Sequence, residues 1–327
     1  MEHGYFIISL DLELMWGMKD KKTVTTYGGN VLGTRKAIPK ILKVFSEKGI
    51  HATWAVVGLL FSGKKIDTLQ MLPARIPVYH QQKLSSYNYL EQLGKDEDSD
   101  KYHYADSLIR LISQFKHQEI ASHTFSHYYC LEDGQTKEDF ASDISAAKKA
   151  GERYNVEIKS VVLPRNQINR AYLDVLIKNN IFSFRGTEEN WLYQATKSNN
   201  HNFIRRFFKV LDAYLNLSGY HCYTLKEAAV KPDLLNLRSS RFLRPYSKMF
   251  SFCEKSKIQR IKAQMKHAAK HHLIFHLWWH PHNFGINTEK NMENLIKILD
   301  YYLYLNKKYG FQSVNMAEIA TKSNTPA

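Results

Sequence analysis

The chain has 327 residues, of which 44% are hydrophobic and 13% aromatic. This length and composition provide a large buried core and exclude a protein whose main state is disordered. Lysine and arginine number 46 against 31 aspartates and glutamates, so the formal charge of +15 points to an acidic or phosphorylated partner without naming a function.

The cysteines and the N-terminal residues bear on the cellular compartment. Cys130, Cys222 and Cys253 are too few and too scattered for a disulfide framework or a CxxC zinc site, which favours a reducing environment. Residues 1–4 lead directly into a strand-like segment, without the apolar stretch and cleavage site of an export signal. The longest nearly apolar run, residues 52–61, is about half of what a membrane helix needs. We therefore expect a cytoplasmic protein that contacts membranes at their surface if at all.

Strands and helices alternate along the sequence. Residues 5–10 predict a strand, and apolar positions then repeat at helical spacing between Thr34, a candidate cap, and Gly49, a candidate stop. Repeated alternation favours a mainly parallel sheet, either open or closed into a barrel. The further predicted elements are strands at 52–57, 119–122, 159–163, 181–184 and 273–279, and helices at about 137–154, 170–179 and 289–308.

Two segments interrupt this alternation. Residues 62–106 include an acidic run at 94–100, which predicts a solvated loop. Residues 231–270 contain eleven Lys or Arg and two Asp or Glu, a net charge of +9. The latter part, 251–270, predicts a basic amphipathic helix that either faces an anionic surface or packs on the outside of the fold. The apolar side of this helix comprises Phe252, Ile258, Ile261 and Met265.

The first candidate site group is an acid pair at the end of the first strand. Asp11 and Glu13 are two residues apart, and side chains at this spacing in a strand lie on the same face. They would point together toward the carboxyl end of the sheet, where active sites of α/β proteins form. Two adjacent carboxylates repel each other unless a cation or a proton lies between them. Taken alone, two solvated acids are the simpler interpretation.

Two histidines follow the predicted strand at 119–122. His123 and His127 can bind one metal ion together, from either a helical turn or a folded loop, because imidazole nitrogens suit zinc and similar ions. An HxxxH pattern is weak evidence in a chain with 15 histidines, but an acid from another strand end strengthens it. Two histidines and a carboxylate leave an open position for water, lower the pKa of that water to about 7 and polarise a carbonyl group.

A histidine-rich group lies on and just beyond the strand at 273–279. His276, His280 and His282 occur within seven residues beside two tryptophans, and one of them is a candidate general acid. Pro281 is expected to end the strand after His280. Histidines of the core or the surface are the alternative interpretation.

The last candidate group follows the strand at 159–163. Arg165 could orient a carboxylate and lower its pKa, while Asn166 and Gln167 offer hydrogen bonds to a polar ligand. A turn at the end of the strand explains these residues equally well. Aromatic side chains could also stack on a sugar ring, although burial is expected for at least half of the four candidates, Trp54, Trp191, Trp278 and Trp279.

Together, these groups resemble the polysaccharide deacetylase family, the carbohydrate esterases with NodB homology. The resemblance covers about residues 5–195 and 271–320, and the order of five elements makes it more specific than any one of them. The matching segments are Ser-Leu-Asp11-Leu-Glu13, His123-Thr-Phe-Ser-His127, Arg165 with Asn166, the weakly similar residues 184–191, and Trp279-His-Pro-His282.

The resemblance implies a distorted (β/α) barrel that forms one catalytic domain over residues 1–327. The domain would carry a polar insertion at about 62–106 and a basic, helical insertion at about 200–270. Leu12 separates two acids that are adjacent in the common pattern, so the roles of Asp11 and Glu13 could be exchanged.

The resemblance also implies the roles of the site residues. One divalent metal, expected to be Zn²⁺ among zinc, cobalt, nickel and iron, would be held by Glu13, His123 and His127. Asp11 would be the general base. The remaining expected site residues are Arg165 as the partner of Asp11, His280 as the general acid directly before Pro281, and Asn166, Trp191 and Trp279 as substrate-binding residues.

The implied reaction is the hydrolysis of an N-acetyl group from an amino sugar. The basic segment and the cytoplasmic location suggest an intermediate of surface-polysaccharide synthesis, whose nucleotide-linked or lipid-linked phosphates would meet Lys and Arg near an anionic membrane. The alternatives are a catalytically silent glycan-binding protein on the same fold, and a hydrolase of a formamide or another amide. Nucleic-acid binding is disfavoured, because no recognised motif accompanies the charge.

Overall fold

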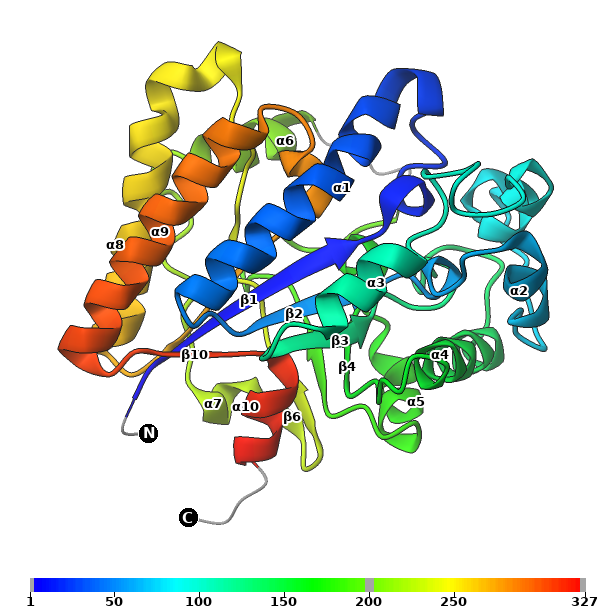
Figure 1. Cartoon of the computed structure of the whole chain (residues 1–327). Coiled ribbons are helices and arrows are strands. Elements are labelled where there is room, and N and C mark those ends of the chain that lie inside the picture. Colours follow the sequence, from blue (N-terminus) through cyan, green and yellow to red (C-terminus); the bar gives the residue numbers. More distant parts are fainter. Residues whose placement is uncertain (1–2, 198–202, 324–327) are drawn as a thin grey trace.

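Parallel strands form the centre of the molecule (Figure 1). The computed structural model describes residues 3–197 and 203–323. The strand order is β6-β7-β5-β4-β3-β2-β1-β9-β8, β10 also pairs with β1, and all pairs of these strands except β6 with β7 are parallel. The strands are β1 (Tyr5–Leu12), β2 (Ala52–Val56), β3 (Gln118–Ser122), β4 (Ser160–Val162), β5 (Ser183–Arg185), β6 (Ala229–Lys231), β7 (Leu234–Asn236), β8 (Arg241–Phe242), β9 (Ile274–Trp279) and β10 (Gln312–Val314).

The sheet closes on itself through one stretch of chain, residues 234–243. On one side, the amide of Leu237 donates to the carbonyl of Phe184 in β5 (2.8 Å). On the other side, the amide of Ser240 donates to the carbonyl of His276 in β9 (2.8 Å). Strand β7 therefore continues the sheet from β5, and β8 joins it to β9. The result is a distorted barrel, which confirms the expected (β/α) fold.

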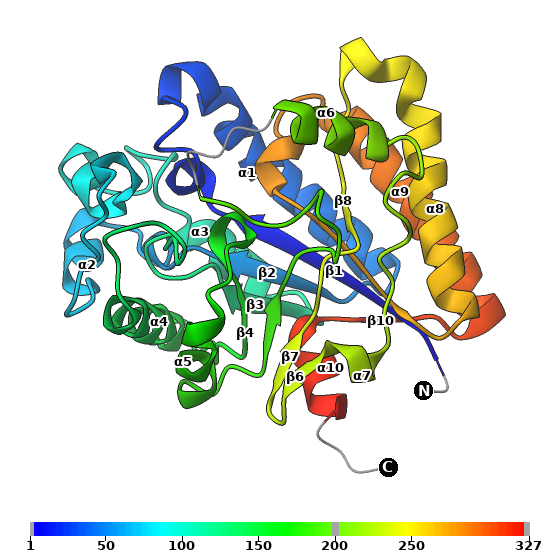
Figure 2. The same ribbon diagram turned by 180° about the vertical axis from the view of Figure 1, so that it is seen from behind.

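Helices cover the outside of the barrel (Figures 1 and 2). Helix α1 (Val24–Glu47) begins with a capping box in which Thr23 and Thr26 bond each other's backbone amides, and its apolar side enters the main core. Thr34, expected to cap this helix, lies inside it, because the capping box starts the helix at Val24. The other helices are α2 (Lys65–Gln70), α3 (Asp106–Ser113), α4 (Lys137–Glu152), α5 (Leu173–Lys178), α6 (Phe203–Asp212), α7 (Leu225–Ala228), α8 (Glu254–Lys270), α9 (Thr288–Tyr309) and α10 (Met316–Ser323).

The strands and helices expected from the sequence are present, with small shifts of their ends except at α1, which begins at Val24 rather than at Thr34. The short strands β6, β7, β8 and β10 are absent from the sequence-based prediction, because two or three residues are too few to show a period. None of the helices in the described ranges is long and apolar enough to cross a membrane.

The polar segment at 62–106, whose acidic run at 94–100 predicts a solvated loop, packs closely on the barrel. It contains α2 and several 3₁₀ turns, and the side chains of Leu90, Leu93 and Tyr104 are buried in the main core. The segment is therefore an ordered cover on one side of the barrel.

The basic segment is partly built into the barrel. Its residues 200–202 lie outside the described ranges, whereas residues 234–243 close the sheet and α8 contacts α9 and β9. Three of the four residues expected on the apolar side of α8 are buried. Phe252 departs from this expectation, because it precedes the helix and is 80% exposed.

Candidate active site

Two acidic side chains meet at the carboxyl end of β1. Asp11 belongs to the strand, and Glu13 follows it as the residue that directly precedes the 3₁₀ turn Leu14–Gly17. The Nε2 atom of His280 lies 3.7 Å from Asp11 Oδ2 and 3.5 Å from Glu13 Oε1, so both acids reach the same place, as the sequence predicts. Gly17 makes room for this arrangement, since a Cβ atom there would lie 2.0 Å from the carboxyl carbon of Glu13.

The HxxxH segment approaches Glu13 from the end of β3. His127 Nε2 lies 2.9 Å and His123 Nε2 lies 3.4 Å from Glu13 Oε2, and all three side chains are buried. The segment is a folded loop rather than a helical turn, because Thr124 (φ 61°) and His127 (φ 57°) adopt the left-handed conformation. Such strain persists only where the surroundings hold the chain in place.

Asp143 of α4 supplies that support. Its carboxylate accepts hydrogen bonds from the backbone amides of Phe125 (2.6 Å) and Ser126 (3.0 Å) and from the Ser126 hydroxyl. The Nδ1 atom of His127 lies 3.0 Å from the hydroxyl of Tyr129, which leaves Nε2 directed at Glu13. The sequence analysis selects neither Asp143 nor Tyr129. Both residues position the histidines, and no sequence motif marks that role.

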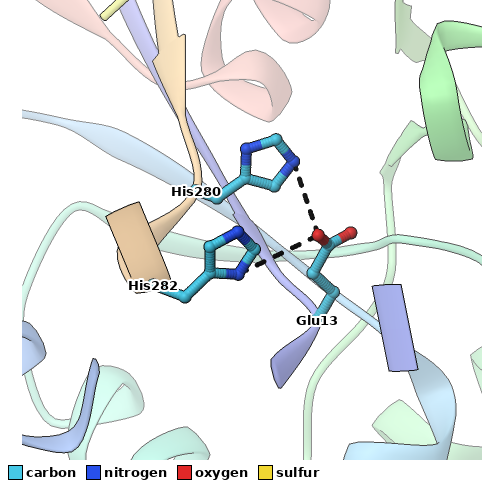
Figure 3. Close-up of side chains that lie close together, drawn as sticks. All are labelled: Glu13, His280 and His282. Carbon is cyan, nitrogen blue, oxygen red and sulfur yellow. Dashed lines mark ion pairs between the residues drawn. The ribbon is translucent and has the colours of Figure 1, made fainter. Parts of the chain in front are cut away.

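The other carboxylate oxygen of Glu13 faces two histidines from beyond β9 (Figure 3). His280 Nε2 lies 3.5 Å and His282 Nδ1 3.9 Å from Glu13 Oε1. The side chain of His282 is 4% exposed, whereas that of His280 is 23% exposed. His280 is therefore the more accessible of the two to a ligand.

The ionisation of these groups suits a metal ion. Burial opposes the charged form of Glu13, but His280 together with bonds to His123 and His127 holds its pKa well below the ordinary value. Burial lowers the pKa of His127 and of His282 to about 3, which keeps both imidazoles neutral. Ionised carboxylates and neutral imidazoles are the forms that bind divalent metals.

At this end of the barrel, two sets of three donors are close enough for a metal. Glu13, His123 and His127 form one set, and Glu13, His280 and His282 form the other, with the ligand atoms of each set within 4.8 Å of one another. The first set is entirely buried, and it is the set implied by the resemblance. Its one carboxylate and two imidazoles fit a divalent ion such as zinc.

Asp11 takes its arginine from β5. Arg185 donates to both carboxylate oxygens of Asp11 at 2.7 Å, and also to Ser9 Oγ (2.9 Å) and Asn166 Oδ1 (3.0 Å). The guanidinium stacks on Trp278, 4.1 Å from the ring centre. Burial opposes ionisation of Asp11, but Arg185 outweighs it and keeps the pKa of Asp11 below the ordinary value.

The expected pairing of Arg165 with Asp11 is therefore wrong. Arg165 lies in a turn beyond β4, forms an ion pair with Asp20 (2.6 Å) and stacks over Tyr129. The sequence does hold a signal for Arg185. Arg185 directly follows Phe184 in a short strand, so the two side chains lie on opposite faces of the sheet. Because Phe184 packs in the apolar cluster on the outside of the sheet, Arg185 faces the inside of the barrel.

The two tryptophans expected to bind substrate, Trp191 and Trp279, also differ from expectation. Trp279 is fully buried and packs on Phe45 and Phe284, so it cannot contact a substrate. Side chains alternate along β9, and this alternation places Trp278 on the inside next to Arg185 and His280. Trp191 is 60% exposed on the loop after β5, and it does not line the cavity described below.

The three late histidines have distinct surroundings. His276 is fully buried, and its Nδ1 and Nε2 atoms are bonded to the carbonyl of Leu237 (2.9 Å) and the hydroxyl of Ser9 (2.8 Å). Both ring nitrogens are therefore occupied by hydrogen bonds within the fold. His280 instead opens onto a cavity of about 600 Å³ that Trp278 and Phe242 also line. Of the three, His280 alone combines access to this cavity with proximity to both acids.

The fold and the site define a class of protein. It is a parallel α/β barrel with a candidate metal centre at the carboxyl ends of its strands. Acid and histidine side chains converge there from β1, from the loop after β3 and from the end of β9.

Comparisons with known proteins give the family. Residues 19–181 match the family model described as polysaccharide deacetylase, and we identify the chain as a member of this family. The match includes His123 and His127 but not Asp11, Glu13 or His280. A search of curated proteins finds no match.

Two solved structures share the fold. A protein from Mycobacterium smegmatis assigned as a polysaccharide deacetylase aligns with a TM-score of 0.61 at 13% identity, over 98% of this chain and 91% of that chain. A protein from Pseudomonas aeruginosa with the same assignment aligns with a TM-score of 0.56 at 11% identity, over 97% and 89%. At these identities the comparison shows the fold.

Proposed function

We propose that this protein is a metal-dependent hydrolase that removes the N-acetyl group of an amino sugar, an intracellular intermediate of surface-polysaccharide synthesis. The observation that carries the proposal is the buried group of Glu13, His123 and His127, with Asp11 and His280 beside it at the end of a cavity. Membership of the polysaccharide deacetylase family supports hydrolysis of an acylated carbohydrate.

The ligands of the metal would be Glu13, His123 and His127. When bound there, a divalent ion, which we expect to be zinc, would polarise the amide carbonyl of the substrate and acidify a water molecule. Glu13 can act as a ligand because it is ionised and shares its Oε2 atom with both imidazoles.

Asp11 is the general base in this proposal. Arg185 keeps Asp11 ionised and fixes its orientation, so that it accepts a proton from the water that attacks the carbonyl carbon. Asn166 contributes by accepting a hydrogen bond from Arg185, which assigns it a positioning role near the substrate.

His280 is the general acid. It lies within 3.7 Å of Asp11 Oδ2 and opens onto the cavity, so it can donate a proton to the departing nitrogen as the C–N bond breaks. The products are the free amine and acetate. Trp278, rather than Trp279, offers an aromatic face to the sugar ring.

Acetate release from N-acetylated sugars by the zinc-loaded protein tests this proposal. We expect turnover in the wild type and a loss of about 10²–10⁴-fold in the His280→Ala variant, the range typical of a general acid. The matched control is Tyr304→Ala, which removes an exposed aromatic ring on α9 and should leave turnover unchanged. Formate release without acetate would indicate a deformylase, and sugar binding without either product would indicate a silent glycan-binding protein.

A further inference from the structure

The cavity that reaches His280 has a strongly cationic wall. Glu188 is the one carboxylate among its described lining residues. That carboxyl accepts a hydrogen bond from Ser239 (2.8 Å), and burial raises its pKa. One carboxylate among the lining residues faces seven cationic side chains. The cationic lining residues are Lys21, Arg165, Lys197, Arg206, Lys209, Arg241 and Arg244.

Four of these seven cations have no carboxylate partner within the described ranges. Lys21, Arg206, Lys209 and Arg244 take part in none of the ion pairs found there, whereas Arg165 and Lys197 pair with acids. Arg244 is half-buried, and this burial lowers the pKa of its guanidinium.

Arg241 adds unused hydrogen-bonding capacity at the same wall. Its Nη1 atom lies 2.6 Å from Asp212, but Asp212 also faces the guanidinium of Arg260 at 3.5 Å, so one carboxylate serves two arginines. The Nη2 atom of Arg241 is buried without a hydrogen-bond partner. Cations withdrawn from water are costly unless an anion pairs with them, and this wall therefore favours an anionic ligand.

We propose that this cavity binds the phosphate or diphosphate group of the sugar substrate, an inference that rests on the proposed hydrolase function. Arg241, Arg244, Lys209 and Arg206 hold the phosphate oxygens, for which guanidinium and ammonium donors are well suited. The sugar ring lies between this wall and His280. A cavity of about 600 Å³ is within the range that encloses small ligands of this kind.

Binding of inorganic pyrophosphate, measured calorimetrically, tests the site apart from catalysis. The measurement uses the wild type and a His123→Ala/His127→Ala variant, so that coordination to a metal does not contribute. We expect both to bind pyrophosphate, and Arg206→Gln/Lys209→Gln to weaken binding at least about tenfold. The control is Lys36→Gln/Arg153→Gln, which removes the same number of positive charges from exposed positions on α1 and after α4. Undiminished binding by the cavity variant would overturn the proposal.

Acetate release separates this inference from the proposed function. The substrates are an N-acetylhexosamine, its 1-phosphate, its uridine diphosphate ester and a short prenyl diphosphate ester. We expect kcat/KM at least about tenfold higher for the phosphorylated forms, and the cavity variant to remove this advantage. Equal values of kcat/KM for the neutral sugar and the phosphorylated forms would overturn this inference. They would not contradict the proposed hydrolase function. Pyrophosphate binding without any acetate release would retain the site and overturn the hydrolase.

A second inference rests on a separate observation, a group of exposed apolar side chains beside the cavity. Figure 2 shows α6 and the turn before α8 at the same end of the molecule. The rings of Tyr214 and Phe250 join the two segments, with centres 6.1 Å apart. These exposed apolar residues are here called the apolar rim, and all are 36–80% exposed. They are Phe203, Ile204, Phe207 and Phe208 of α6, Leu215 and Leu217 after α6, and Met249, Phe250 and Phe252 before α8.

We infer that the apolar rim docks on an anionic lipid bilayer. Exposed Arg206, Lys248 and Lys255 lie among its aromatic side chains, and this combination is typical of helices that lie in a membrane interface. Arg206 and Lys209 of α6 also line the cavity, so a docked protein would present its cationic wall to a phosphate at the membrane surface.

Co-sedimentation with lipid vesicles tests this docking. We expect the wild type to bind vesicles of phosphatidylcholine with phosphatidylglycerol, and Phe207→Ser/Phe252→Ser to abolish binding. The control Ile66→Ser/Val78→Ser removes two apolar side chains elsewhere that are 60% and 68% exposed, and it should bind like the wild type. Equal binding by the rim variant would overturn the inference. A wild-type dimer that dissociates in the rim variant, without vesicle binding, would instead assign the rim to a second copy of the chain.

Discussion

Two groups of one glutamate and two histidines lie at opposite ends of the barrel. Glu13, His123 and His127 lie at the carboxyl ends of the strands and are fully buried. Glu318 of α10 contacts His51 and His117, which directly precede β2 and β3, at 2.7 and 3.7 Å. The side chains of this second group are 24–53% exposed.

The difference shows that residue type alone does not make a metal centre. At Glu13 the imidazoles are withdrawn from water, and Asp143 holds the strained loop that carries them. At Glu318 the rings of His51 and His117 stack on each other in contact with water, and the carboxylate already accepts the backbone amide of Asn315. Preorganisation and exclusion of water favour the first group as a metal ligand set.

The largest effect is expected for the ligands themselves. Elemental analysis of the purified protein should find about one divalent metal per chain, and His123→Ala/His127→Ala should remove it together with turnover, because a single imidazole pair supplies two of the three protein ligands. The same substitutions at the other end of the barrel, His51→Ala/His117→Ala, should leave the metal content unchanged. Two metals per chain, or loss of metal only in the second variant, would reverse this comparison.

The next largest effect is expected at Arg185. In Arg185→Gln, Asp11 would remain buried without its partner, which costs about 3–5 kcal/mol in the free energy of unfolding. Arg185 lowers the pKa of Asp11, so its removal should raise that pKa and shift the acid limb of kcat/KM to higher pH.

Thermal unfolding and a pH profile of turnover measure both effects of this substitution. The comparison variant is Arg165→Gln. In this variant the carboxylate of Asp20, the partner of Arg165, still has the positively charged amines of Lys19 and Lys21 nearby. It should lose less stability than Arg185→Gln and leave the acid limb in place. An unchanged acid limb in Arg185→Gln would remove Arg185 from its role beside the base.

A smaller effect is expected at Asp143, which holds the loop that carries His123 and His127. Asp143→Ala removes the acceptor of two backbone amides next to His127, which should weaken metal affinity about 10–100-fold and lower the free energy of unfolding by about 1–3 kcal/mol. Glu138→Ala, which removes an exposed acid from the same helix, is the control. Competition with a chromogenic chelator measures the affinity. Equal affinities of the two variants would show that the loop holds its shape without Asp143.

The sequence predicts the parts of this molecule that have a strong local pattern. Alternating strands and helices, the acid pair of Asp11 and Glu13, and the convergence of the HxxxH segment on Glu13 all follow from spacing and from the ends of predicted strands. The position of His280 at the mouth of the cavity agrees with its place directly before Pro281.

The sequence does not predict contacts that depend on which side of a short strand faces inward. Arg185 ends a three-residue strand, and Trp278 and Trp279 exchange roles with a shift of one position. The sequence also does not predict that residues 234–243 close the barrel. Their alternating pattern is short, and the net charge of the surrounding basic segment is the stronger feature of the sequence. Tertiary context alone shows that Arg241 and Arg244 of the basic segment belong to one cavity wall.

The smallest effect is expected at Glu318. Burial opposes ionisation of this carboxyl, but bonds from His51 and from the amide of Asn315 outweigh it and lower its pKa. A lowered pKa in the folded state stabilises the protein above the pKa of the unfolded chain, and this contribution disappears as the pH falls through the folded value. Glu318→Gln should therefore cost under about 1 kcal/mol near neutral pH and nothing in acid, with metal content and turnover unchanged. Unfolding at two pH values measures the difference, and a loss of metal in this variant would show that the exposed group also binds an ion.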